Sequence, residues 1–135
     1  MSEPGDAVAP SLADFERMAD AAFDALPADF RALCQDVVIR IADFADDETL
    51  KAMEIENPFE LTGLYEGVDL TRRSNLDTAQ QPDFVWLYRR PILEEWCERG
   101  DVTLYRLIEH VLVHEIGHHF GLTDDDIDAI EARED

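Results

Sequence analysis

The sequence predicts one α+β domain preceded by a short flexible tail. Helical hydrophobic periodicity occurs at both ends of the chain, and three stretches of strand-like composition lie between them. Neither an internal repeat nor a linker divides the 135 residues, a length that suits a single core. We therefore expect residues 1–10, which are small and include two prolines, to form the tail, and residues 11–135 to form the domain.

The first helix is expected to begin after Ser11, which can form a capping box with Asp14, and to end before Pro27. A further helical turn is expected at residues 29–33. The apolar residues of the first helix recur on one face: Phe15, Met18, Ala22, Phe23 and Leu26.

Two stretches have the composition of strands. Residues 36–44 are rich in β-branched residues, which alternate at Val37, Ile39 and Ile41. Residues 84–90 form the strongest strand of the chain, which we expect Pro91 to end. This second strand could present a sheet edge to an extended peptide, or it could be an ordinary sheet strand.

The segment between these strands is less regular. Residues 46–55 could form a short helix or a loop, and residues 59–70 predict a strand broken near Gly63 or Gly67. Residues 71–83 have the composition of a loop.

The last long helix is expected to start near Asp101, after a short helix at residues 92–99 that Gly100 stops. Its helical stripe begins apolar and ends polar: Leu104, Leu107, Ile108, Val111, Leu112, Glu115 and His118. Glu115 and His118 thus stand where the pattern calls for core residues, and such conflicts are typical of functional sites.

The bulk composition excludes several function classes. The formal net charge of −21 argues against binding of nucleic acids or anionic membranes.

Cys34 and Cys97 lie in apolar segments, so we expect two buried, reduced thiols. The chain starts without a signal peptide pattern and has no apolar run of membrane-spanning length, which predicts a soluble cytoplasmic protein.

All four histidines lie within residues 110–119. His114 and His118 are four apart, so both imidazoles of one helix can reach a single zinc ion. Glu115 lies between them and is suited to accept a proton from a water bound to that ion. His110 cannot share the same ion with His118, because about 12 Å of helix separates them.

The third ligand must therefore follow a change of chain direction. Gly121 can adopt the left-handed conformation that ends a helix, and Asp124 comes three residues later. The resulting pattern, His114-Glu115-x-x-His118-x-x-Gly121-x-x-Asp124, has the spacing of the extended zincin motif with aspartate in place of the third histidine. Carboxylate oxygen is an acceptable zinc ligand.

The neighbours of the motif have simpler interpretations. Asp125 and Asp126 favour the N-terminus of a following helix, for which Thr123 and Asp126 can form a cap. His119 points about 100° away from His118 and is expected to support the site or the fold rather than bind metal. His110 is expected to support the ligands or to approach substrate.

The chain resembles the small, single-domain bacterial zincin-like metallopeptidases. The resemblance rests on FDALPADF, VVIRIADF, LTGLYEG, LYRRPIL and, most specifically, VHEIGHHFGLTDDD. It implies a minimal zincin fold, in which a small, mostly antiparallel or mixed sheet packs with an active-site helix and flanking helices. It also implies that His114, His118 and Asp124 bind zinc and that Glu115 is the catalytic carboxylate.

Two features depart from larger relatives of this class. Metzincins have a methionine turn after the third ligand, whereas the last methionine here is Met53. The hydrophobic floor of the site must therefore come from elsewhere, such as the long helix itself. Secreted zincins with an aspartate ligand also carry a signal peptide, whereas this chain starts without the pattern of one.

The favoured function is zinc-dependent hydrolysis of peptide bonds in a peptide or protein substrate. An oxyanion donor is not evident from the motif, and the candidates remain open: Tyr65, Tyr88, Tyr105, Arg89 and His110. One alternative is a metal-stabilised domain that binds a protein partner without catalysis. A less favoured one is a metal-dependent RNA-processing hydrolase, against which both Glu115 and the acidic charge argue.

Overall fold

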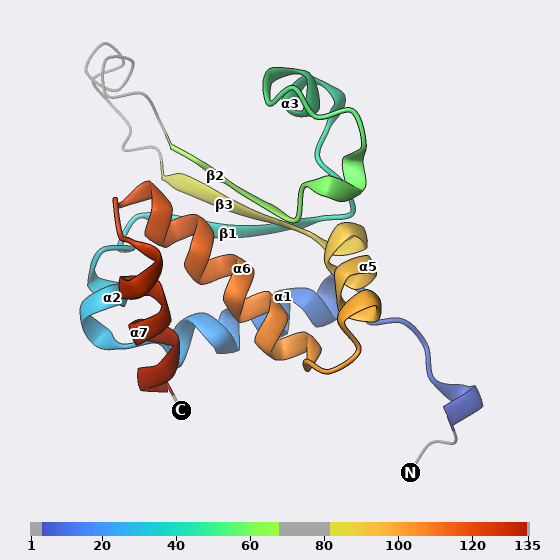
Figure 1. The fold of residues 1–135 in the computed structure, drawn as a ribbon, viewed down its shortest axis with the longest axis horizontal. Coiled ribbons are helices and arrows are strands. Elements are labelled where there is room, and N and C mark those ends of the chain that lie inside the picture. The colour runs from blue at the N-terminus through green and yellow to red at the C-terminus, as the bar shows by residue number, and fades with distance from the viewer. Residues whose placement is uncertain (1–3, 68–81, 135) are drawn as a thin grey trace.

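A three-stranded mixed sheet lies at the centre of the fold (Figure 1). The computed structural model describes residues 4–67 and 82–134. The strand order is β1 (Val37–Ala42), β3 (Asp83–Tyr88) and β2 (Gly63–Glu66), with β1 parallel and β2 antiparallel to β3. The predicted α+β class with a small mixed sheet is thus confirmed.

The position of β3 corrects one expectation. The strand does not offer an edge to a peptide, because it pairs with β1 on one side and β2 on the other. Its buried residues explain the central place, because Val85, Leu87 and Tyr88 are at most 3% exposed. The edge that faces the last long helix belongs to β2 instead.

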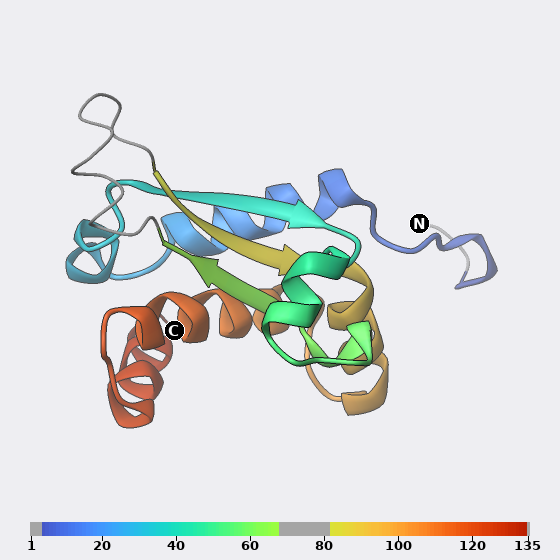
Figure 2. The ribbon, with the colours of Figure 1, turned by 90° about the horizontal axis from the view of Figure 1, so that it is seen from above.

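Two helices, α1 (Leu12–Asp24) and α6 (Leu104–His119), cover one face of the sheet and pack against each other (Figure 2). The predicted capping box of α1 is present: Ser11 Oγ accepts from the Asp14 N–H, and Asp14 Oδ2 accepts from the Ser11 N–H. The α6 helix begins at Leu104 rather than near Asp101, because Thr103 is its N-cap and accepts from the Arg106 N–H at 3.2 Å.

The shorter helices surround this layer. They are α2 (Ala28–Ala32), α3 (Asp47–Ala52), α5 (Arg89–Arg99) and α7 (Asp124–Glu134), with 3-10 turns at Pro4–Asp6 and Pro58–Glu60. Gly100, in the left-handed conformation, ends α5 as expected. Pro91 lies in the first turn of α5 and does not end β3, which stops at Tyr88.

The main core fills the space between α1, α6 and the sheet. Phe15, Val85, Ile108, Leu112 and Ile116 are all fully buried in it. A second, smaller cluster under α3 covers part of the opposite face and includes Leu50, Leu61 and Tyr88. The long helix therefore rests on a continuous apolar base, which holds the residues that follow Leu112 in a fixed position.

The two cysteines differ from each other. Cys34 is buried, and burial raises the pKa of its thiol to about 11. Cys97 is exposed, so its predicted burial is wrong. None of the described helices is long and apolar enough to cross a membrane. The predicted loop at residues 71–83 lies mostly outside the described residues.

Candidate metal centre

The C-terminal half of α6 carries the histidine motif. His114 and His118 lie one turn apart, and their ring centroids are 5.4 Å from each other. The His114 side chain is 24% exposed and that of His118 is 54% exposed. The helix stripe therefore does not continue into the core at His118, contrary to the sequence pattern, and His118 faces solvent at the end of the helix.

A tight turn reverses the chain after α6. Gly121 has a φ of 79°, which confirms the predicted left-handed conformation. The Leu122 N–H donates to the Gly117 carbonyl at 2.9 Å, and the Gly121 N–H donates to the His118 carbonyl at 3.1 Å. These two hydrogen bonds form a Schellman motif, which satisfies the last carbonyls of α6 and directs the chain back along the helix.

The next helix, α7, starts directly after this turn. The Asp126 N–H donates to Thr123 Oγ1 at 3.1 Å, and the Thr123 N–H donates to Asp126 Oδ2 at 3.0 Å. This reciprocal pair confirms the predicted cap and lowers the pKa of Asp126. Asp126 is thus committed to the cap, and the carboxylate that the turn brings back to α6 is Asp124.

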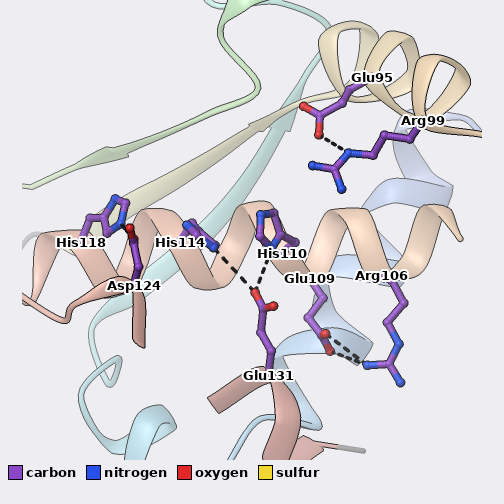
Figure 3. Close-up of polar contacts among 9 residues, drawn as sticks. All are labelled: Glu95, Arg99, Arg106, Glu109, His110, His114, His118, Asp124 and Glu131. Carbon is purple, nitrogen blue, oxygen red and sulfur yellow. Dashed lines mark hydrogen bonds and ion pairs between the residues drawn. The ribbon is translucent and has the colours of Figure 1, made fainter. Parts of the chain in front are cut away.

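Asp124 meets the two histidines as the motif predicts. His118 Nε2 lies 3.2 Å from Asp124 Oδ1 (Figure 3). One ligand atom from each of His114, His118 and Asp124 lies within 4.8 Å of the other two. Two imidazoles and one carboxylate are a donor set that suits zinc and leaves room for a further ligand.

An unpartnered polar atom supports the fit to a metal. His114 Nε2 is buried and has no hydrogen-bond partner among the described residues. A buried nitrogen without a partner is costly, and coordination of a cation would satisfy it. Burial, followed by the charge of His110, lowers the pKa of His114, so the ring favours the neutral form that a metal requires.

Glu115 lies next to this group but on the side of the sheet. Burial raises the pKa of its carboxyl group, whereas the charge of His118 and a hydrogen bond from the Tyr65 backbone N–H lower it. The β2 strand passes close by at Gly63, where a β-carbon would lie 3.2 Å from Glu115 Cγ and 2.7 Å from Val111 Cγ1. Glycine thus allows β2 to approach the carboxylate.

Other contacts engage His119 and two of the candidate oxyanion donors, Tyr65 and Arg89. His119 stacks on Tyr65, with ring centroids 3.8 Å apart, which supports the expected structural role of His119. The Tyr65 hydroxyl donates to Asp83 at 2.7 Å, and burial raises the pKa of Tyr88 to about 12. Arg89 pairs with Asp43 at 3.0 Å. These contacts select no oxyanion donor among the candidates.

Sequence reasoning missed Glu131. This residue of α7 faces α6, where its Oε1 lies 3.0 Å from His110 Nδ1 and 4.0 Å from His114 Nε2 (Figure 3). A signal was present: Glu131 follows Asp124 by seven residues, which places both on one face of a helix. His110 is thereby held by a carboxylate.

A protein family model matches most of the chain. The model of a family described as zincin-like metallopeptidase matches residues 34–134, from just before β1 through α7. The matched region includes the motif, Asp124 and Glu131, whereas α1 and α2 precede it. No curated protein matches the chain.

Proposed function

The chain belongs to the zincin-like metallopeptidase family, and from this premise we propose that it is a zinc-dependent peptidase. The observation that carries the proposal is the group of His114, His118 and Asp124, whose ligand atoms converge within 4.8 Å around a buried, unpartnered nitrogen of His114. The family implies a metal, typically zinc. The three residues would hold the ion and leave a coordination position open.

The ion supplies one kind of chemistry: bound zinc is a Lewis acid that makes water nucleophilic near neutral pH and polarises a carbonyl group. Glu115 then acts on the attacking water. Its carboxylate accepts one proton as the water oxygen bonds to the peptide carbon, and it returns that proton to the amide nitrogen as the C–N bond breaks and the amine leaves. Partial burial suits this role, because it raises the proton affinity of the carboxylate.

The proposed binding site of the peptide is the edge of β2. The Tyr65 backbone N–H donates to Glu115, so the outer edge of β2 faces the catalytic carboxylate. An extended peptide that adds to β2 through main-chain groups other than the Tyr65 N–H, which Glu115 engages, would lie beside that carboxylate. Main-chain recognition of this kind fits a peptide or protein substrate.

A Glu115→Gln variant tests the function. The amide keeps the shape of the side chain but cannot accept the proton, so we expect one zinc per chain and a loss of hydrolysis of about 100-fold or more. Elemental mass spectrometry and a fluorogenic peptide library measure the two properties. The control is Glu98→Gln, which changes an exposed glutamate on α5 and should leave both unchanged.

Full hydrolysis by zinc-loaded Glu115→Gln would contradict the mechanism. A parent protein that binds zinc, cleaves no peptide of the library and unfolds when the metal is chelated would instead support the metal-stabilised binding domain.

A further inference from the structure

The α7 helix runs back along α6 and turns two carboxylates toward a row of three histidines. His110, His114 and His118 follow one another at single turns of α6 (Figure 3). Asp124 contacts His118 near the turn, and Glu131 contacts His110 two turns of α7 further on. The two helices therefore offer carboxylate ligands at both ends of the histidine row.

The end of the histidine row at His110 offers the same kinds of metal ligand as the end at His118. One ligand atom from each of His110, His114 and Glu131 lies within 4.8 Å of the other two. His110 Nδ1 and His114 Nε2 lie 3.0 and 4.0 Å from the same carboxylate oxygen, Glu131 Oε1. All three residues are partly buried, whereas His118 and Asp124 are exposed. The second group is thus the more sheltered of the two.

A cavity adjoins this group. It has a volume of about 350 Å³, and its lining includes His110, Glu131, Asp128, Arg99 and Arg106. A water molecule occupies about 30 Å³ in the liquid, so the cavity has room for the waters that would complete a coordination shell. The buried nitrogen of His114 lies 4.0 Å from Glu131 and lacks a hydrogen-bond partner there.

We propose that His110, His114 and Glu131 form a second binding site for a divalent transition-metal ion, called the second seat. This site competes with the first seat, the binding site formed by His114, His118 and Asp124. A neutral imidazole has a single lone pair available, so His114 can serve one ion at a time. An ion in the second seat leaves only His118 and Asp124 at the first. The second seat therefore holds the ion in a position that is not catalytic.

Removal of the first seat tests this proposal by metal binding alone. His118→Ala with Asp124→Ala deletes two exposed side chains and should leave the core intact. We expect this double variant to bind one zinc ion, more weakly than the parent. Adding Glu131→Gln should weaken binding by about a further 10-fold or more, while adding His119→Ala should not. Competition with a chromophoric chelator gives the affinities, and circular dichroism verifies folding.

The parent protein supplies a second measurement. Because the seats share His114, titration should end at one zinc per chain, and Glu131→Gln alone should retain that ion. Two zinc ions held together by the parent would overturn the mutual exclusion.

The second seat depends on the proposed function only through the shared His114, and the outcomes separate the two. Binding by the parent but none by His118→Ala/Asp124→Ala overturns the second seat and leaves the first. Equal affinities with and without Glu131→Gln in that double variant overturn it as well. No zinc in the parent overturns both.

Discussion

A β-carbon on Gly117 would lie 2.9 Å from two carbon atoms of the Ile127 side chain. The backbone of α6 therefore approaches α7 at the one motif position between Glu115 and His118 that has no room for a side chain. Ile127 is fully buried at this contact. The close packing of Gly117 and Ile127 sets the separation of the two helices, and hence the positions of Asp124 and Glu131 relative to the histidines.

Gly117→Ala should destabilise the protein and weaken zinc binding. Alanine favours helix over glycine by about 1 kcal/mol. Overpacking against a buried side chain typically costs about 1–3 kcal/mol, so we expect a net loss of stability. Urea unfolding and zinc affinity of the same variant measure the two effects.

A partner substitution identifies the cause. Ile127→Ala removes both side-chain carbon atoms that the new β-carbon would meet, so Gly117→Ala should cost less in the Ile127→Ala background. Equal costs in both backgrounds would mean that this contact does not set the separation of the helices.

Gly63→Ala should affect hydrolysis more than metal binding. The new β-carbon would lie 2.7 Å from Val111 Cγ1, 3.1 Å from the Trp86 carbonyl oxygen and 3.2 Å from Glu115 Cγ. It should displace β2 from α6 and weaken the hydrogen bond between Tyr65 and Glu115. We expect a lower kcat with one zinc still bound, measured beside Gly5→Ala, where a β-carbon meets nothing. Unchanged kcat would show that the approach of β2 is not needed.

Local signals in the sequence predicted much of the fold. The Ser11–Asp14 box, the Thr123–Asp126 box and the left-handed Gly121 each depend on residues within a few positions of one another. Such interactions can be recognised without tertiary information. The convergence of His118 and Asp124 follows from the same turn, which is why the motif spacing predicted their contact.

Features that depend on tertiary packing were missed or misplaced. The central position of β3 depends on its pairing with β1 and β2, and composition alone does not determine strand order. The role of Glu131 requires α7 to pack against α6, a consequence of Ile127 and Gly117 fitting together. Cys97 shows the limit of reading burial from apolar neighbours, since it lies on the exposed side of a short helix.

The two thiols should react at very different rates. Exposed Cys97 should react with a disulfide reagent within the mixing time at mildly alkaline pH. Cys34 is buried, with its pKa raised to about 11, so about a thousandth of it is thiolate near pH 8. We expect one fast and one slow phase, with the fast phase absent in Cys97→Ser. Two fast phases in the parent would contradict the burial of Cys34.

The cap of α1 should give stability a pH dependence. Hydrogen bonds from the backbone and side chain of Ser11 lower the pKa of Asp14 below 3.8. The charged carboxylate is therefore favoured in the folded state, and its contribution is present above pH 3.8 and lost as the pH falls through the lower, folded-state pKa. Asp14→Asn should be less stable than the parent in urea at neutral pH, and the difference should vanish below that pKa. A difference that persists in strong acid would exclude this origin.

The most direct test of the metal centre is the zinc content of His114→Ala. His114 belongs to both ligand groups, whereas neighbouring His119 belongs to neither and serves as the matched control in His119→Ala. After reconstitution with zinc and dialysis against a metal buffer, elemental mass spectrometry should find one zinc per chain in the parent and in His119→Ala. It should find none in His114→Ala. A parent without zinc, or a His114→Ala variant that retains it as the parent does, would contradict the assignment of this site.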